Sequence, residues 1–310
     1  MGGNGKTALK GGRKWMSKRE KRDALYACGF LLLNVIGFLT FTLSPVVSSF
    51  VISFFRWPVL QPPEFIGLQN YVTMFTNDPQ FFRYLGNTFQ FALLYVPLAI
   101  VSALALGIWL SKKFRFIAFF RVLFFLPVLS PSVAISSIWR WIYNPDYGLI
   151  NSILRSVNVA NPPRWLGDPK LAMFSVVLCI LWSRVGYNAV IFIAGIKGIP
   201  ETLYEAADID GGNAWSKFWR ITLPLLSPSI FFVLVITLIN SFQVFDQIYV
   251  MTNGGPMGAT TTLVFSIYRN GFEYFNMGYA SAMAWVLFAI IFALTLLNLQ
   301  MQKNWVNYDL

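Results

Sequence analysis

The stretch NTFQFALLYVPLAIVSALALGIWL, residues 87–110, decides the class of fold, because it runs for 24 residues without a charged side chain. A helix of about 20 apolar residues spans the hydrocarbon core of a bilayer, whereas a membrane strand needs only about ten. Backbone groups in hydrocarbon must be paired within the protein, so only helices and closed barrels can span it. The length of the stretch favours a helix.

Similar apolar runs recur along the chain and predict an all-α membrane protein with about six transmembrane helices. The predicted spans are about 24–55, 87–110, 117–141, 171–195, 223–249 and 277–301. The first exceeds one crossing and is expected to tilt or to extend outside beyond Pro45. Only 12% of the residues are charged, about half the share in an average soluble domain. That leaves too little polar surface for a soluble enzyme.

The basic residues predict the orientation of these spans. Eight of them precede the first span, namely Lys6, Lys10, Arg13, Lys14, Lys18, Arg19, Lys21 and Arg22. They predict a basic cytoplasmic N-terminal tail over 1–23 and a membrane domain over 24–310. With this tail inside, 16 of the 24 Lys and Arg lie on the inner side, seven lie outside and Arg184 alone lies at membrane depth. Both termini are therefore expected in the cytoplasm, and the net charge of +11 does not indicate nucleic-acid binding.

Several kinds of chemistry are not expected on this chain. It has no histidine and no GxxxxGK[ST] phosphate loop, so we predict no catalytic residue and no metal site. Its two cysteines, Cys28 and Cys179, lie in separate apolar runs and do not indicate a disulfide framework. If the protein uses ATP, another chain must bind it.

The most informative polar stretch is IPETLYEAADIDGGNAWSKFWRITLPLLSPS, residues 199–229. Pro200 suits a first helical turn, and Gly211-Gly212 suits the left-handed end of a helix. Asn213 is then placed to cap a second helix that carries Trp215 and Trp219. From spacing alone, two interpretations remain open: a helix that binds a partner, or an amphipathic helix on the bilayer surface.

At this point the residues resemble a known family. The pattern Glu205-Ala206-Ala207, Asp210-Gly211 and Leu223-Pro224 is similar to the EAA loop of permease subunits of bacterial ABC importers. The resemblance implies a type I ABC importer permease fold with a cytoplasmic coupling loop over 197–222. In that family the loop docks on the ATP-hydrolysing subunit, which implies a coupling role for Glu205, Ala206, Ala207, Asp210 and Gly211. Gly212 departs from the family, where alanine is commoner.

Further motifs resemble the carbohydrate branch of this family, the MalF/UgpA-like permeases. They are Phe65–Tyr71, Asn87-Thr88, Leu126-Pro127, Asn144–Gly148 and Thr252–Pro256. The resemblance implies a sugar importer of the bacterial cytoplasmic (inner) membrane, with no cofactor on this chain. Its implied partners are a second, similar permease, two subunits that bind ATP and Mg, and an external solute-binding protein.

Polar side chains within the predicted spans are candidates for the substrate pathway, since such groups usually face a bundle interior or a water-filled path. Arg184 and Asn188 lie on one helix face, as do Thr237 and Ser241. The resemblance implies that these four and Ser132 contact the solute. Alternatively, they hold helices together, and Arg184 pairs with Asp246. An arginine in the pathway favours an acidic or phosphorylated sugar.

Two other function classes remain possible from the sequence. An ion-coupled secondary transporter would normally need more spans and acids within them, and Asp246 is the one candidate. An intramembrane enzyme would need a histidine or paired acids. The sequence favours the importer subunit.

Overall fold

The computed structural model describes residues 17–112, 114–303 and 305–306, except for the side chains of residues 20 and 21. Residues 1–16 of the predicted basic tail lie outside this part. The chain divides into two compact units, residues 1–51 and 52–310. The boundary predicted after residue 23 marks the end of the basic tail, whereas the boundary after residue 51 separates two compact units. The former stays a prediction.

The first unit holds one long apolar helix. It comprises α1 (Lys18–Phe38), the π-helical turn η1 (Leu39–Leu43) and the start of α2 (Ser44–Ile52). The π turn ends two residues before Pro45, which has no N–H to continue the α-helical ladder. Leu25, Phe30 and Phe41 are all exposed within the chain itself. A helix that is apolar all round suits lipid or another membrane chain.

The second unit contains the other elements. In order, they are β1 (Phe55–Arg56), β2 (Glu64–Phe65), α3 (Gln69–Thr76), α4 (Pro79–Ser111), α5 (Ile117–Leu129), α6 (Ser132–Ile142), α7 (Leu149–Ser156), α8 (Ala172–Gly198), α9 (Glu201–Ile209), α10 (Ala214–Lys217), η2 (Phe218–Thr222), α11 (Leu223–Leu225), α12 (Ser227–Phe242), α13 (Asp246–Met251), α14 (Leu263–Tyr268), η3 (Arg269–Glu273) and α15 (Met277–Gln302). β1 and β2 pair antiparallel. The all-α prediction is confirmed.

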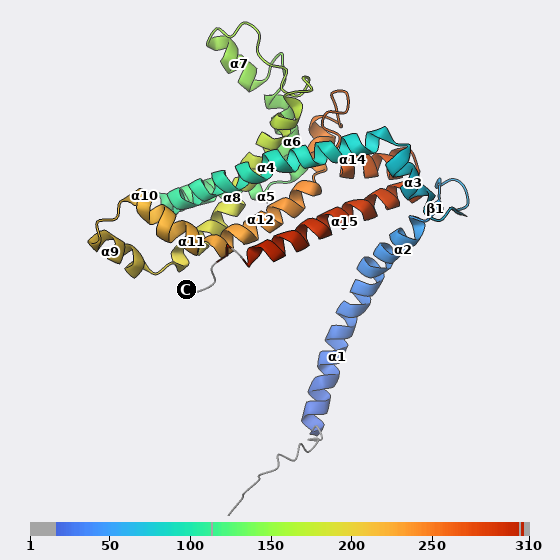
Figure 1. The fold of residues 1–310 in the computed structure, drawn as a ribbon, viewed down its shortest axis with the longest axis horizontal. Coiled ribbons are helices and arrows are strands. Elements are labelled where there is room, and N and C mark those ends of the chain that lie inside the picture. The colour runs from blue at the N-terminus through green and yellow to red at the C-terminus, as the bar shows by residue number, and fades with distance from the viewer. Residues whose placement is uncertain (1–16, 113, 304, 307–310) are drawn as a thin grey trace, which may run out of the picture. The chain divides into compact units, whose positions relative to one another are not determined.

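Long helices form the body of the second unit. α8 packs along α4 and crosses α5, while α12 packs on both α4 and α15 (Figure 1). Glycines permit the closest approaches, as is common where membrane helices cross. A Cβ at Gly107 of α4 would lie 2.8 Å from the Cβ of Phe192 on α8. A Cβ at Gly186 of α8 would overlap the carbonyl oxygen of Phe124 on α5.

Two predicted spans match single helices closely, and a third is longer than predicted. α8 and α15 coincide with the predictions at 171–195 and 277–301 within a few residues. α4 begins eight residues before the predicted start at 87, because Asp78 caps it and Pro79 occupies its first turn. The Asp78 carboxylate accepts hydrogen bonds from the backbone N–H groups of Gln80 and Phe81.

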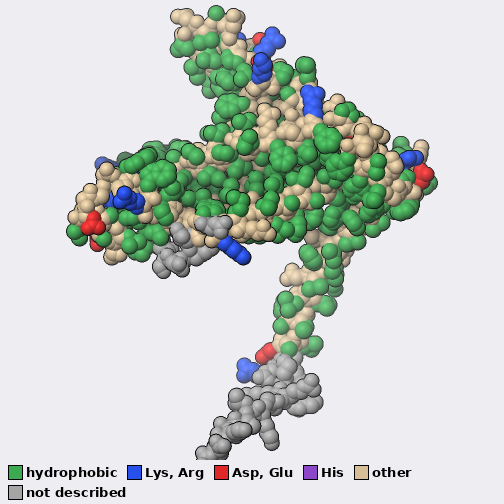
Figure 2. Space-filling model, in the orientation of Figure 1, with side chains coloured by type: hydrophobic (Ala, Val, Ile, Leu, Met, Phe, Trp, Pro, Cys, Tyr) green, Lys and Arg blue, Asp and Glu red, His purple; other side chains and the backbone are tan. Residues whose placement is uncertain are grey.

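The other two predicted spans in this unit are bent helix pairs rather than straight helices. α5 and α6 meet at 100°, and the α10–α11 segment meets α12 at 64°. Pro131 explains the first break, because it disfavours helical geometry at Ser130, whose ψ is 141°. Within the described residues, four helices are long and apolar enough to span a membrane, or up to six if each bent pair is one span. Figure 2 shows hydrophobic side chains over most of the visible surface of the long helices.

Candidate functional site

A cavity of about 480 Å³ lies among α4, α8, α12 and the start of α13. Its polar lining comes from three helices. α8 contributes Arg184 and Asn188, α12 contributes Thr237 and Asn240, and α13 contributes Asp246. Aromatic side chains complete the lining, among them Phe91, Tyr95, Tyr187 and Phe245. A pocket of mixed aromatic and hydrogen-bonding groups is suited to a polar organic solute such as a sugar.

The structure brings three of the predicted pathway residues together in this cavity, namely Arg184, Asn188 and Thr237. Ser132 lines a smaller cavity of about 110 Å³, to which Arg184 and Gln247 also contribute. Ser241 is buried instead, and its hydroxyl donates to the carbonyl oxygen of Leu238 at 2.6 Å. In this conformation Ser241 therefore bonds its own helix.

Three lining amides escaped the sequence analysis: Asn240, Gln243 and Gln247. They lie where the predicted span 223–249 is interrupted, since α12 ends at Phe242 and α13 begins at Asp246. Irregular backbone at membrane depth is tolerated where it lines a cavity. The amides near the end of the predicted span 223–249 could have indicated these lining residues. The apolar pair Val244-Phe245 between them, however, makes the sequence read as one continuous helix.

The predicted Arg184–Asp246 pair is not formed in this conformation. The ion pairs among the described residues do not include Arg184. The Asp246 carboxylate instead accepts a hydrogen bond from the Ser132 hydroxyl at the start of α6. α6 packs on α13, and Arg140 at its other end donates to the Val250 carbonyl at 3.4 Å.

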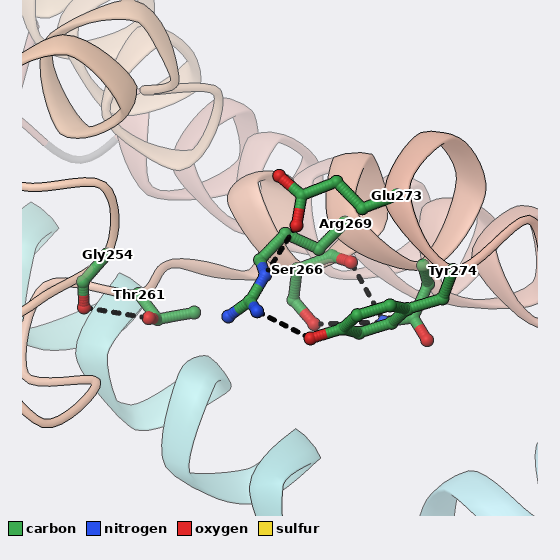
Figure 3. Close-up of polar contacts among 7 residues, drawn as sticks. Gly254, Thr261, Ser266, Arg269, Glu273 and Tyr274 are labelled. Atoms are coloured by element: carbon green, nitrogen blue, oxygen red, sulfur yellow. Dashed lines mark hydrogen bonds and ion pairs between the residues drawn. The ribbon is translucent and has the colours of Figure 1, made fainter.

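An ordered loop after α13 is attached to the first turns of α4. Asn87 donates from Nδ2 to the carbonyl oxygens of Gly258 and Thr261, both at 2.9 Å. The hydroxyl of Thr88 accepts the N–H of Leu263 at 2.9 Å. The Thr261 hydroxyl in turn donates to the Gly254 carbonyl at 2.9 Å (Figure 3). The motifs Asn87-Thr88 and Thr252–Pro256, far apart in sequence, are therefore parts of one hydrogen-bonded structure.

A polar cluster follows this loop on η3. Figure 3 shows the Arg269 guanidinium between Glu273 and Tyr274; it donates to Glu273 Oε2 at 3.0 Å and to the Tyr274 hydroxyl at 2.5 Å. Burial is the largest single influence and lowers the pKa of Arg269, but the hydrogen bond to Glu273 and the charge interactions with Glu273 and two neighbouring tyrosines together raise the pKa above its ordinary value. The cluster stabilises the turn that leads into α15.

At the opposite end of the second unit, α9 stops where the sequence predicts (Figure 1). Gly211 has a φ of +75°, and its N–H bonds the Asp208 carbonyl at 3.1 Å. The N–H of Gly212 bonds the Ala207 carbonyl at 2.7 Å, which completes a Schellman motif. Asn213 then caps α10 by accepting the N–H of Ser216 at 2.8 Å. Both the predicted helix end and the predicted cap are confirmed.

One face of α9 holds it to the rest of the loop, and the other is free. The Tyr204 hydroxyl lies 2.9 Å from that of Thr222, and Lys217 Nζ lies 2.5 Å from Asp208 Oδ1. The free face consists of exposed residues at helical spacing: Thr202, Glu205, Ala206 and Ile209. Figure 2 shows acidic side chains at this end of the unit. Of the predicted alanine pair, Ala206 belongs to the free face, whereas Ala207 is half-buried.

α9 and all of the cavity lining except Phe91 lie in a region that matches a known family. Residues 95–303 match the family described as binding-protein-dependent transport system inner membrane component. The chain is 37% identical over 312 residues to a probable ABC transporter permease protein, YesP, of Bacillus subtilis, covering 100% of this chain and 99% of that one. It is 33% identical to the trehalose/maltose transport system permease protein MalF of Thermococcus litoralis, covering 93% and 97%.

A solved structure shares the fold. The chain superposes with a TM-score of 0.82 and 25% identity on a chain of a bacterial ABC transporter involved in the import of the acidic polysaccharide alginate. The superposition covers 92% of this chain and 97% of that chain. The predicted type I importer permease fold is therefore confirmed.

Proposed function

This chain belongs to the family of binding-protein-dependent transport system inner membrane components, and we infer from this that it is the transmembrane permease subunit of an ATP-binding-cassette importer for a sugar or sugar derivative. The relatives that resemble it along nearly their whole length are ABC permeases, several of them named for sugars. The ion-coupled alternative is not favoured, because Asp246 is the one acid among the residues lining the main cavity.

The observation that carries this function is the free face of α9. α9 is short, ends in a Schellman turn and is held to the rest of the loop through Tyr204 and Lys217. Its exposed Glu205 and Ala206 are available to contact a partner subunit. A helix attached in this way can pass a movement of that partner on to the membrane helices. We propose that Glu205, Ala206, Ala207, Asp210 and Gly211 couple the chain to an ATP-binding subunit. The contacts must differ between two conformations if ATP hydrolysis is to drive transport. ATP and Mg are bound by the partner, and this chain has no catalytic role.

The orientation follows from the same proposal. α9 lies on the cytoplasmic side of the bacterial inner membrane, and so do the N- and C-termini. The start of α13, which contributes to the cavity lining, then lies toward the outer side of the membrane. An external solute-binding protein delivers the sugar there.

A second, similar permease subunit completes the pathway. Arg184, Asn240, Gln243 and Asp246 line the cavity and are exposed in the isolated chain. Charged and amide groups at membrane depth are costly when they face lipid. A second permease over this face would remove them from lipid and enclose the solute between two subunits.

The position of Arg184 in the cavity favours a transported sugar that carries an acidic group. It lines the cavity, and no carboxylate of the described residues neutralises it. A guanidinium presents a planar fork that matches a carboxylate or phosphate. Relatives of this chain include the permease of an sn-glycerol-3-phosphate transport system and that of an arabinooligosaccharide transport system, so the family handles both charged and neutral solutes.

The test is uptake by the reconstituted complex. The chain is co-expressed with its proposed partners, a second permease, an ATPase subunit and a solute-binding protein, and the complex is placed in proteoliposomes. Radiolabelled maltose, arabinotriose and an alginate trisaccharide are then offered with external binding protein and internal ATP. We expect ATP-dependent uptake of at least one sugar, and we expect Arg184→Gln to reduce uptake of the alginate trisaccharide more than that of maltose.

Charge reversal on α9 tests the coupling role. Glu205→Lys is expected to abolish co-purification of the ATPase, whereas Glu64→Lys, an exposed acid at the β1–β2 turn, leaves it intact. Retention of a stoichiometric ATPase by Glu205→Lys would count against α9 as the docking helix. ATP-independent uptake driven by a proton or sodium gradient would favour the secondary transporter instead.

A further inference from the structure

Asp246 is a charged group in the main cavity to which no role has been assigned. It lines the cavity together with Gln243 and Gln247, and its side chain is exposed. The Ser132 hydroxyl donates to one of its two carboxylate oxygens, Oδ2. Arg184 lines the same cavity without forming an ion pair to it. Among the described residues, Oδ1 accepts no hydrogen bond, whereas Oδ2 is occupied by the Ser132 hydroxyl.

The chemistry of a carboxylate suits it to sugar hydroxyls. An ionised Asp accepts hydrogen bonds at both oxygens and donates none, and adjacent hydroxyls on a sugar ring present two donors side by side. Hydrogen bonds to a charged acceptor are shorter and stronger than those between neutral groups. The flanking amides of Gln243 and Gln247 supply both donors and acceptors for the rest of the ring.

We propose that Asp246 binds two neighbouring hydroxyl groups of the transported sugar, one at each carboxylate oxygen, and that the hydroxyl group at Oδ2 displaces that of Ser132. This inference rests on the proposed sugar-import function and deepens it. It assigns recognition of the hydroxyl groups to Asp246, separately from recognition of an acidic group by Arg184. It applies to neutral and acidic sugars alike.

The exchange of partners has a mechanical consequence. Ser132 is the first residue of α6, directly after the 100° bend at Ser130-Pro131. Its hydrogen bond fixes one end of α6 to α13, and the Arg140 contact fixes the other. A sugar that occupies the Asp246 carboxylate releases the Ser132 end, so that solute binding loosens α6 from α13.

The test measures uptake of the three labelled sugars by the complete complex, with sugar-loaded binding protein at saturation so that its own affinity does not limit the rate. Asp246→Asn is expected to lower the uptake rate about tenfold or more, as for loss of a hydrogen bond to a charged group. Ser132→Ala removes the competing donor and is expected to raise the rate about twofold or more. In the double variant, the Ser132→Ala gain is expected to disappear.

Glu64→Gln is the matched control, because Glu64 is an exposed acid paired with Arg56 and does not line the cavity. Assembly of each complex is checked by size-exclusion chromatography, and Asp246→Glu, which keeps the charge, is expected to retain more uptake than Asp246→Asn. Equal rates for Asp246→Asn and Glu64→Gln would overturn the proposal, as would a Ser132→Ala complex as slow as Asp246→Asn. A wild-type complex without ATP-dependent uptake would overturn the proposed function itself.

Discussion

Gly186→Ala should destabilise the membrane domain through a clash that no side-chain rotation can relieve. The added Cβ would overlap the carbonyl oxygen of Phe124 and lie 2.6 Å from its carbonyl carbon and 3.2 Å from the Cα of Phe125. All three are backbone atoms of α5. Overpacking of this kind costs about 1–3 kcal/mol, against a gain of about 0.5–1 kcal/mol for replacing a helical glycine by alanine. The net expectation from the central values is a loss of about 1 kcal/mol, with an upper bound of about 2.5 kcal/mol.

The same substitution at Gly198, the last residue of α8, is the matched control. A Cβ there meets no heavy atom within 4 Å, so only the helix-propensity gain remains. Thermal unfolding of the complex in lipid nanodiscs, followed by intrinsic tryptophan fluorescence, compares the two variants. We expect a lower midpoint for Gly186→Ala and an unchanged or higher midpoint for Gly198→Ala. Equal midpoints would refute the close α5–α8 crossing.

Three further predictions concern the two ends of the domain. Asn87→Ala leaves the carbonyl groups of Gly258 and Thr261 without their donor, so we expect the free energy of unfolding to fall by about 1–3 kcal/mol. The same unfolding assay measures this, and an unchanged midpoint would contradict the loop attachment. Gly211→Val forces a β-branched residue to a φ of +75°, so it should reduce ATPase stimulation by loaded binding protein more than Gly211→Asn does; equal effects would argue against a strained turn. Tyr204→Phe should weaken that stimulation while the complex still assembles, because the mutation removes one hydrogen bond worth about 1 kcal/mol; unchanged stimulation would show that the bond to Thr222 is dispensable.

Hydropathy was sufficient for the helical class and for the positions of α8 and α15, since each of these helices is mostly apolar and contains no proline. It placed the start of α4 too late because the first two turns carry Arg83, which bonds a loop rather than faces lipid. Such contacts join residues more than 170 positions apart. No pattern among neighbouring residues in the sequence predicts such long-range contacts.

The breaks within the predicted spans were harder to place. Pro131 signals the bend between α5 and α6, but not its angle, which depends on how α6 packs on α13. The interruption before Asp246 is flanked by apolar residues, so the amides that it brings into the cavity were not selected. Ser241 was selected by its spacing from Thr237, yet the hydroxyl bonds the Leu238 carbonyl of its own helix.

The cytoplasmic loop over 197–222 was predicted more completely than the cavity. Schellman and N-cap geometries depend on residues within one turn, so Gly211-Gly212 and Asn213 indicated them directly. The cavity depends on which faces of four helices meet, and this is decided by packing between distant segments.

The central claim is that α9 contacts an ATP-hydrolysing subunit on the cytoplasmic side. It is tested most directly by site-specific cross-linking of Ala206→Cys, on the free face, in a background where Cys28 and Cys179 are serine. Leu60→Cys, which replaces a side chain 89% exposed near the β1–β2 turn, is the comparison. We predict a cross-link from position 206 to the ATPase, none from position 60, and labelling of position 60 alone by an impermeant thiol reagent added to cells. Labelling of position 206 from outside, with no cross-link to the ATPase, would contradict the account.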